Sequence, residues 1–342
     1  GSGIISDRYL VLIGDANLKD TSGKNFNVSG LKANEVAFED MGNWLYQLDV
    51  KANQNTLVKL TADYNKTTQY FKGSASETEQ LIKGADDYYT LRLIYDFKTN
   101  YLVSGLVGNQ TITDTLELEE VMIVRSHHDE AQTLKISDDG SVTAKKAYGV
   151  MTFDKTTLND NSKSQYERAL YWVSFPFDVQ LDKVFGFGNY GEHWIMEYYD
   201  GAERAEKGLW KEPTYSYWKF IEDPKGYILE AGQGYVLCLD LDLLGNNAEF
   251  WKHDNTEIAL YFPSNGKDTI VINNQATERK TIVPEHRCTI ERDDRKTKDS
   301  NWNIIGVPAY TKIAEIKSQN LNFYYQYIAG DDPETNIDET NS

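Results

Sequence analysis

The feature that most constrains this chain is an alternation of apolar and polar residues with a period of two. In residues 44–50, 89–97 and 235–243 the apolar side chains fall at every second position. Successive side chains of a strand point to opposite faces of a sheet, so these segments predict strands with one face in a core and one in water. Residues 116–124 follow the same pattern except at Glu119 and Glu120, where the break indicates a β-bulge.

Tight-turn sequences separate these segments. Asp-Gly or Asn-Gly pairs occur at 139–140, 200–201 and 265–266, and such pairs accept the positive φ angles of hairpin turns. The best helical patterns are two short stretches, at 76–82 and 202–208. We therefore predict an all-β fold of two antiparallel β-sandwich domains, Ig-like or jelly-roll-like in arrangement.

The length of the chain predicts two domains. Its 342 residues exceed what one hydrophobic core usually supports. A polar stretch at 126–132 marks the expected boundary, which gives an N-terminal β-sandwich domain at 1–130 and a C-terminal one at 131–330. Residues 331–342 read as a polar, acidic tail, so we expect the chain to be one segment of a longer protein.

The charge of the chain excludes two classes of partner. A net charge of -18 repels phosphate backbones and anionic headgroups, and no Lys/Arg cluster is dense enough to reverse that field locally. No apolar run approaches the roughly 18 residues that a membrane-spanning helix needs. We predict no nucleic-acid partner and no membrane insertion.

No catalytic set can be assembled from local sequence. No serine or cysteine lies in a G-x-S-x-G context, and the histidines are scattered. Glu197 and Asp200 form the best carboxylate pair, but we prefer to interpret them as a solvated or salt-bridged surface pair. We therefore predict no catalytic residues and no enzymatic activity.

Metal sites are also not predicted. In His127-His128-Asp129 adjacent side chains of an extended segment point apart, and no further ligand lies at a suitable spacing. The sequence Asp240-x-Asp242-x-x-Gly245 is similar to the start of a calcium loop, but it lacks the distal glutamate. We expect no cofactor, with calcium at this turn as the alternative.

The two cysteines leave two interpretations open. Cys238 and Cys288 both lie in strand-like sequence. A disulfide needs Cα atoms within about 7 Å, which sequence does not reveal. Either a bridge or two buried thiols fits the pattern.

A concentration of aromatic residues between Trp194 and Phe220 is the most informative local feature. Sugar rings stack on flat aromatic faces while neighbouring polar groups bind their hydroxyls. The candidate ligand-binding residues are Trp194, Tyr199, Asp200, Arg204, Trp210 and Trp218, placed near a predicted hairpin tip at 200–201. The alternative is that these aromatic residues fill the sandwich core, as large aromatic residues of β-domains usually do.

Several segments carry a resemblance to a known group of proteins. They are residues 95–105, 148–153, 173–179, 185–188, 193–195, 198–201, 232–237 and 302–308. Together they resemble large modular surface or secreted proteins of gut and oral Bacteroidales, in which a W-x-x-I-S-x-P module precedes a W-N-x-I-G-x-P segment. The resemblance implies a place outside a Bacteroidales cell and a part in a multi-module chain, but no particular activity. It leaves residues 1–94 uncovered.

These observations predict a non-catalytic binding or adhesion segment of a larger protein, extracellular or on the outer cell surface. The expected partner is a glycan or a host surface protein. The alternative is a carbohydrate-binding accessory region of a glycan-degrading or glycan-uptake system.

Overall fold

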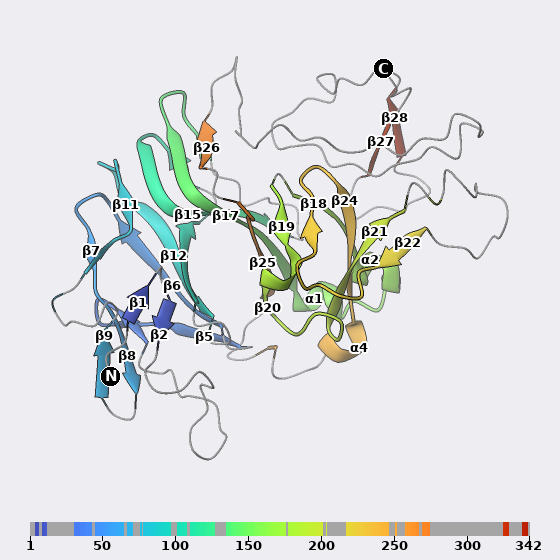
Figure 1. Ribbon diagram of the computed structural model, residues 1–342, viewed down its shortest axis with the longest axis horizontal. Coiled ribbons are helices and arrows are strands. Elements are labelled where there is room, and N and C mark those ends of the chain that lie inside the picture. Colours follow the sequence, from blue (N-terminus) through green and yellow to red (C-terminus); the bar gives the residue numbers. More distant parts are fainter. Residues whose placement is uncertain are drawn as a thin grey trace. The chain divides into compact units, whose positions relative to one another are not determined.

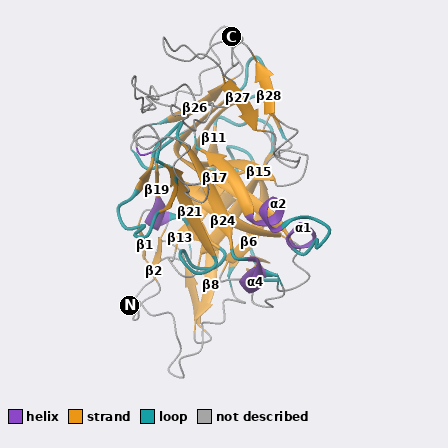
Figure 2. Cartoon of the chain, turned by 90° about the vertical axis from the view of Figure 1, so that its right-hand side faces the viewer, coloured by secondary structure: helices purple, strands orange, loops and turns teal. Residues whose placement is uncertain are grey.

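The computed structural model is built mainly from strands, with only short helices among them (Figures 1 and 2). It describes residues 4–6, 9–11, 31–42, 45–64, 67–70, 76, 78–96, 101–107, 110–126, 135–175, 177–200, 203, 217–245, 250–251, 257–266, 269–273, 324–327 and 337–340. The all-β fold class is thereby confirmed. In these residues no helix is long and apolar enough to cross a membrane.

The chain divides into two compact units and passes between them more than once. The first unit contains Gly1–Lys155, Lys183–Phe187 and Asn246–Ile282, and the second contains Thr156–Asp182, Gly188–Gly245 and Val283–Ser342. The boundary predicted at 130/131 falls inside the first unit. The reason is that the strands before and after it, at Thr115–Ser126 and Ser141–Asp154, pair with each other.

Two sheets form most of the described part of the first unit (Figure 1). One has the order β1 (Ile4–Ser6), β2 (Tyr9–Val11), β13 (Tyr101–Leu106), β12 (Tyr89–Asp96), β6 (Leu45–Ala52), β5 (Glu39–Gly42). The other has the order β11 (Ile82–Lys83), β15 (Thr115–Ser126), β17 (Ser141–Asp154), β25 (Glu257–Pro263), β20 (Phe185–Gly186), and β26 (Ile270–Asn273) also pairs with β17.

Smaller sheets complete the described part of this unit. One has the order β4 (Val36–Ala37), β3 (Lys32–Ala33), β8 (Leu60–Tyr64), β9 (Thr67–Tyr70). Two strand pairs join β7 (Leu57–Val58) to β10 (Glu79–Gln80) and β14 (Thr111–Ile112) to β16 (Lys135–Ile136). Within the stretch 76–82 that was predicted as helical, Glu79–Gln80 and Ile82 belong to strands β10 and β11, so that prediction was wrong.

One apolar cluster joins the two large sheets. Its buried members are Leu45, Ile94, Val103, Met122, Tyr148, Val150 and Tyr261. The first three come from β6, β12 and β13, and the others come from β15, β17 and β25. Both sheets bury apolar side chains in this one core. The hydrophobic effect of that burial is the main force that holds the two sheets together.

Strand β12 departs from the predicted one-sided burial. Leu93, Ile94, Tyr95 and Asp96 are consecutive and all buried, so both faces of this half of the strand are covered. The strict alternation holds only at its start, where Thr90 and Arg92 are half-buried. A strand covered on both faces needs a nearly continuous apolar run, which the Leu-Ile-Tyr sequence supplies.

The pairing of β15 with β17 departs from the predicted antiparallel arrangement. These strands are parallel neighbours from Thr115 beside Ser141 to Ser126 beside Thr152. The register does not shift at Glu119 and Glu120, so the predicted bulge is absent there. Instead, Glu120 is buried and accepts hydrogen bonds from the Ser104 amide (3.3 Å) and hydroxyl (3.2 Å) on β13.

The described strands of the second unit form one sheet of four strands and two strand pairs. The sheet has the order β18 (Leu170–Ser174), β24 (Gly234–Leu239), β21 (Trp194–Tyr199), β22 (Trp218–Phe220). The pairs join β19 (Val179–Gln180) to β23 (Ile228–Leu229) and β27 (Tyr324–Tyr327) to β28 (Ile337–Thr340). The helical elements are α1 (Lys155–Leu158), α2 (Gln165–Ala169), α4 (Leu241–Leu244) and a 3-10 turn at Leu181–Lys183.

Helix α4 shortens a strand that the sequence predicts as far as residue 243. The Asp240 carboxylate accepts a hydrogen bond from the Leu243 amide at 3.0 Å and so caps the helix. An aspartate at this position satisfies an amide that the first helical turn leaves unpaired. Strand β24 therefore ends at Leu239.

Replacing the two neighbouring glutamates of β15 should have unequal effects on stability. Glu120 is 4% exposed, and Glu120→Ala would remove the acceptor for Ser104 and the charge opposite Lys146, at a cost of about 3 kcal/mol. Glu119→Ala is the matched control, because its ion pair with Lys145 is exposed and contributes under about 1 kcal/mol. Urea unfolding followed by circular dichroism measures both, and equal losses of stability would contradict the buried position of Glu120.

Candidate functional site

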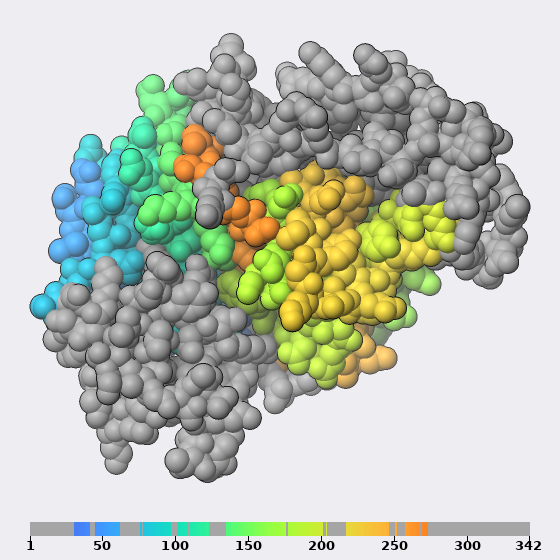
Figure 3. Space-filling model, viewed as in Figure 1, coloured from blue at the N-terminus to red at the C-terminus, as the bar shows by residue number. Residues whose placement is uncertain are grey.

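The four-stranded sheet of the second unit has one buried face and one partly exposed face. Trp194, Met196 and Leu237 are buried on the first face. On the other face Glu197 lies between Val236 on β24 and Phe220 on β22. Phe220 is 42% exposed, so this second face reaches solvent at least at β22. Residues coloured gold around β24 also form part of the surface shown in Figure 3.

Three half-buried aromatic residues gather on the partly exposed face, and we call Trp172, Tyr199 and Trp218 the aromatic cluster. The Trp218 ring meets Trp172 edge to face, with centroids 5.0 Å apart and planes at 77°. It meets Tyr199 at 5.2 Å and 62°. These distances and angles are typical of favourable aromatic pairs, which contribute about 0.5–1.5 kcal/mol each beyond area burial.

The two tryptophans of the aromatic cluster come from opposite edges of the sheet. Strands β18 and β22 are separated by β24 and β21, which would place their backbones about 14 Å apart at a strand spacing of about 4.8 Å. The two indole rings therefore lean toward each other across the middle strands. Gly234 lies on β24, one of these middle strands, and is buried; it has no side chain that would stand between the two rings. Rigid strands thus hold these rings at fixed angles.

Burial changes the ionisation of two groups on the same face. Burial raises the pKa of Glu197, because a carboxylate with less water around it is harder to ionise. Burial, with Glu197 nearby, raises the pKa of the Cys238 thiol to about 12. Cys238 carries a free thiol, and Cys288 lies outside the described residues. A raised pKa leaves little of the Cys238 thiol ionised at neutral pH, so it lacks the thiolate character of a catalytic cysteine.

The structure separates the candidate residues of the aromatic stretch. Tyr199 and Trp218 lie together, directly paired across β21 and β22. Trp194 is 4% exposed and belongs to the core, so a place for it on a binding surface was wrong. A strand position facing the interior explains this, because Trp194 and Met196 share that face. Arg204 and Trp210 lie outside the described residues.

Asp200 has a local structural role. Its amide donates to the Tyr217 carbonyl at 2.8 Å, and its carboxylate accepts from the Glu203 amide at 2.9 Å. Strand β21 ends at Tyr199 and β22 begins at Trp218, so Asp200 is not in a two-residue hairpin turn between them as predicted. Gly201 lies outside the described residues. Trp172 was missed because it lies on β18, far from the aromatic stretch in sequence; its only sequence signal is an aromatic pair, Tyr171-Trp172.

The first unit contains a second candidate site, which we call the polar hollow. It is a depression of 430 Å³ lined by Asp87, Tyr88, Tyr89, Gln110, Thr111 and Thr113. These residues come from the turn before β12, from Tyr89 at the start of that strand, and from the segment that leads through β14 into β15. Tyr88 is 66% exposed, which shows that the hollow opens to solvent.

A hydrogen-bond network centred on Asp114 holds the walls of the hollow together. One oxygen of Asp114 accepts from the Tyr89 hydroxyl (3.0 Å) and from the amides of Asp86 (3.2 Å) and Asp87 (3.1 Å). The Thr113 hydroxyl donates to the Asp87 carboxylate at 3.2 Å. The two segments are thereby tied to each other at several points.

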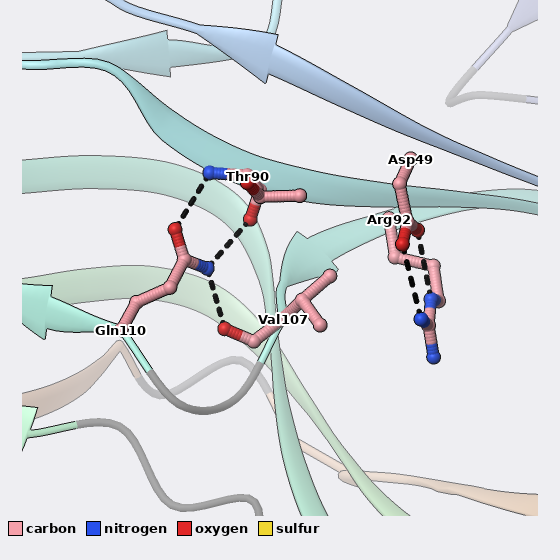
Figure 4. Close-up of polar contacts among 5 residues, drawn as sticks. All are labelled: Asp49, Thr90, Arg92, Val107 and Gln110. Atoms are coloured by element: carbon pink, nitrogen blue, oxygen red, sulfur yellow. Dashed lines mark hydrogen bonds and ion pairs between the residues drawn. The ribbon is translucent and has the colours of Figure 1, made fainter.

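Gln110 extends the β12 ladder with its side chain, as Figure 4 shows. Its amide oxygen accepts from the Thr90 amide at 2.6 Å, and its amide nitrogen donates to the Thr90 carbonyl at 2.8 Å. On the same strand, Arg92 makes two hydrogen bonds to Asp49 of β6 (Figure 4). The side chain of Gln110 thus binds Thr90 just beyond the β12–β13 ladder, where the Val107 amide donates to the same Thr90 carbonyl at 3.1 Å.

Gly84 allows the wall at 84–88 to approach β15. Its φ angle is 73°, in the left-handed region that favours glycine. A Cβ atom there would lie 2.1 Å from the Thr115 carbonyl oxygen. A side chain at this position would push the segment at 84–88 away from Thr115 on β15.

The structure offers no metal centre among the residues it describes. Within them, no group of three or more His, Cys, Asp or Glu side chains surrounds a common point. His127, His128 and Asp129 lie outside the described residues. Asp240 caps α4, and calcium binding at its turn stays a prediction. His193 accepts a hydrogen bond from the Asn189 amide at 3.0 Å, so that ring nitrogen is occupied.

Comparisons with known proteins identify no family for this chain. No protein-family model, no curated protein and no solved structure matches the chain. The resemblance to Bacteroidales surface proteins therefore stays a prediction.

The raised pKa of Glu197 makes stability depend on pH. Because the folded pKa lies above the unfolded one, the unfolded chain releases its proton first, and stability falls as pH rises from the ordinary glutamate pKa to the folded value. Glu197→Gln should therefore raise the urea midpoint at pH 7 and leave it unchanged at pH 3. A lower midpoint at pH 7 would show that the ionised carboxylate stabilises the fold.

Proposed function

We propose that the chain is a non-catalytic binding or adhesion segment of a larger modular protein that is displayed on the cell surface or secreted. The observation that carries the proposal is the aromatic cluster, with Trp172, Tyr199 and Trp218 half-buried on one sheet face. The resemblance to surface proteins of Bacteroidales and the absence of dense basic clusters support the location and the class of partner.

The aromatic cluster suits recognition for a physical reason. Large rings supply much contact area and have few rotatable bonds, so little entropy is lost when a ligand orders them. Strands fix the three rings more firmly than a loop would. Exposed Phe220 and half-buried Glu197 extend the same face, and they add an apolar edge and a hydrogen-bond acceptor.

The proposal includes no chemistry at Glu197 and Asp200. The Asp200 carboxylate is engaged by the Glu203 amide, and Glu197 lies beside Val236 and Phe220 on the sheet face. A hydrolase that used two carboxylates would need them about 5–10 Å apart on either side of a substrate bond. We therefore assign both residues structural or ligand-contacting roles.

A carbohydrate-binding accessory region of a glycan-degrading or glycan-uptake system is the second candidate function. The specific observation in its favour is the combination of Glu197 with Trp172 and Tyr199, whose rings lie at 77° and 62° to Trp218, on one sheet face. Stacking on the rings and hydroxyl contacts to the carboxyl group would together recognise a sugar.

Replacing Trp218 with alanine should weaken ligand binding about tenfold, since one stacking ring contributes about 1.4 kcal/mol. The purified chain is first screened on an array of glycans and extracellular-matrix proteins, and the affinity of the best binder is then measured. Tyr199→Ala is the second variant. Tyr166→Ala is the matched control, because Tyr166 is 75% exposed on α2 and lies outside the aromatic cluster.

Thermal unfolding of each variant separates lost binding from lost structure. Unchanged affinity in both folded variants would contradict the proposal. So would the absence of any binder on the array. Turnover of a glycan that disappears in Glu197→Gln would replace the binding function by an enzymatic one.

A further inference from the structure

The polar hollow is an open depression with room for one small polar molecule. Its 430 Å³ lies near the lower end of the roughly 300–1,000 Å³ that is usual for small-molecule sites. Five of the six lining side chains carry a hydroxyl or a carboxylate, and the sixth carries an amide. Such a surface matches a ligand that presents several hydroxyl groups.

Two lining groups are available to a ligand. In the described part of the chain, neither the Tyr88 hydroxyl nor the Thr111 hydroxyl makes a hydrogen bond to protein. Tyr88 is 66% exposed, so its aromatic side chain is open to solvent at the hollow. An aromatic face next to hydroxyl partners is the combination that a pyranose ring requires, because its C–H face stacks while its hydroxyls form hydrogen bonds.

The rest of the lining is held in place before any ligand arrives. The Tyr89 hydroxyl donates a hydrogen bond to Asp114, and the Thr113 hydroxyl donates one to Asp87. Gln110 accepts one from the Thr90 amide. Little conformational entropy remains to be lost at these groups on binding. The framework is thus preorganised around Tyr88 and Thr111.

The charge of the hollow decides between sugar classes. Asp87 lines it, Asp86 and Asp114 border it, and no lysine or arginine is among the lining residues. A carboxylate or sulfate on a ligand would meet like charge without a cationic partner. A neutral sugar avoids this repulsion and can donate its hydroxyls to the Asp87 carboxylate.

We propose that the polar hollow binds one pyranose unit of a neutral glycan, with Tyr88 as the stacking ring and Asp87 and Thr111 as hydroxyl partners. The site lies wholly in the first unit, so it is separate from the aromatic cluster on which the proposed function rests. Either site can fail without the other.

Saturation-transfer NMR on the full chain tests this. The probes are methyl glycosides of glucose, galactose, mannose and N-acetylglucosamine, compared with glucuronic acid and N-acetylneuraminic acid. We expect at least one neutral glycoside to bind and the two acids to bind at least tenfold more weakly. Tyr88→Ala should weaken neutral binding at least tenfold, Tyr88→Phe should keep most of it, and Thr111→Val should cause an intermediate loss.

Tyr166→Ala is the control, as an equally exposed tyrosine of the other unit. Thermal unfolding confirms that each variant is folded, which is expected because Tyr88 is exposed. The proposal is overturned if no neutral glycoside binds, if the acids bind equally well, or if Tyr88→Ala binds like the parent. Sugar binding that is lost only in Trp218→Ala would move the site to the aromatic cluster and also overturn it.

Discussion

The parallel pairing of β15 with β17 is the interaction on which the first unit depends. It is the longest ladder in the described part of the chain, and β17 also pairs with β25 and β26. Met122 on β15 and Tyr148 and Val150 on β17 enter the core shared with the other large sheet. If this ladder were lost, the sheet would lose its central strands. The shared core would then lose the side chains that β15 and β17 contribute.

The same ladder also positions the polar hollow. Strand β14 pairs in parallel with β16 immediately before β15 and β17 begin, and the Ser141 amide donates to the Asp114 carbonyl at 3.0 Å. Asp114 is therefore fixed by its backbone at the start of the ladder, while its carboxylate holds the opposite wall through Tyr89. A packing constraint in the core is in this way carried to the surface that lines the polar hollow.

Periodicity predicted the strands well where a single sheet face decides the pattern. It located the beginnings of β6 and β24 to within one residue. It could not reveal that β15 and β17 are parallel, because strand direction depends on tertiary pairing and not on alternation. It also misread Glu120 as a bulge, since a buried carboxylate bonded to Ser104 looks polar in sequence. At the candidate site, Tyr199 and Trp218 were found by aromatic density, but the hollow was not, because residues 86–89 and 110–114 meet only after folding.

The most direct test of the account is the distance between residues 115 and 141. In a chain whose two native cysteines are replaced by alanine, Thr115→Cys and Ser141→Cys carry spin labels. Parallel pairing places these residues side by side, about 5 Å apart at the backbone, so strong dipolar broadening and a label distance below about 20 Å are predicted. An antiparallel hairpin of the same two strands would separate them by about 11 residues, or more than about 30 Å. A distance in that range would contradict the parallel ladder and the hollow built on it.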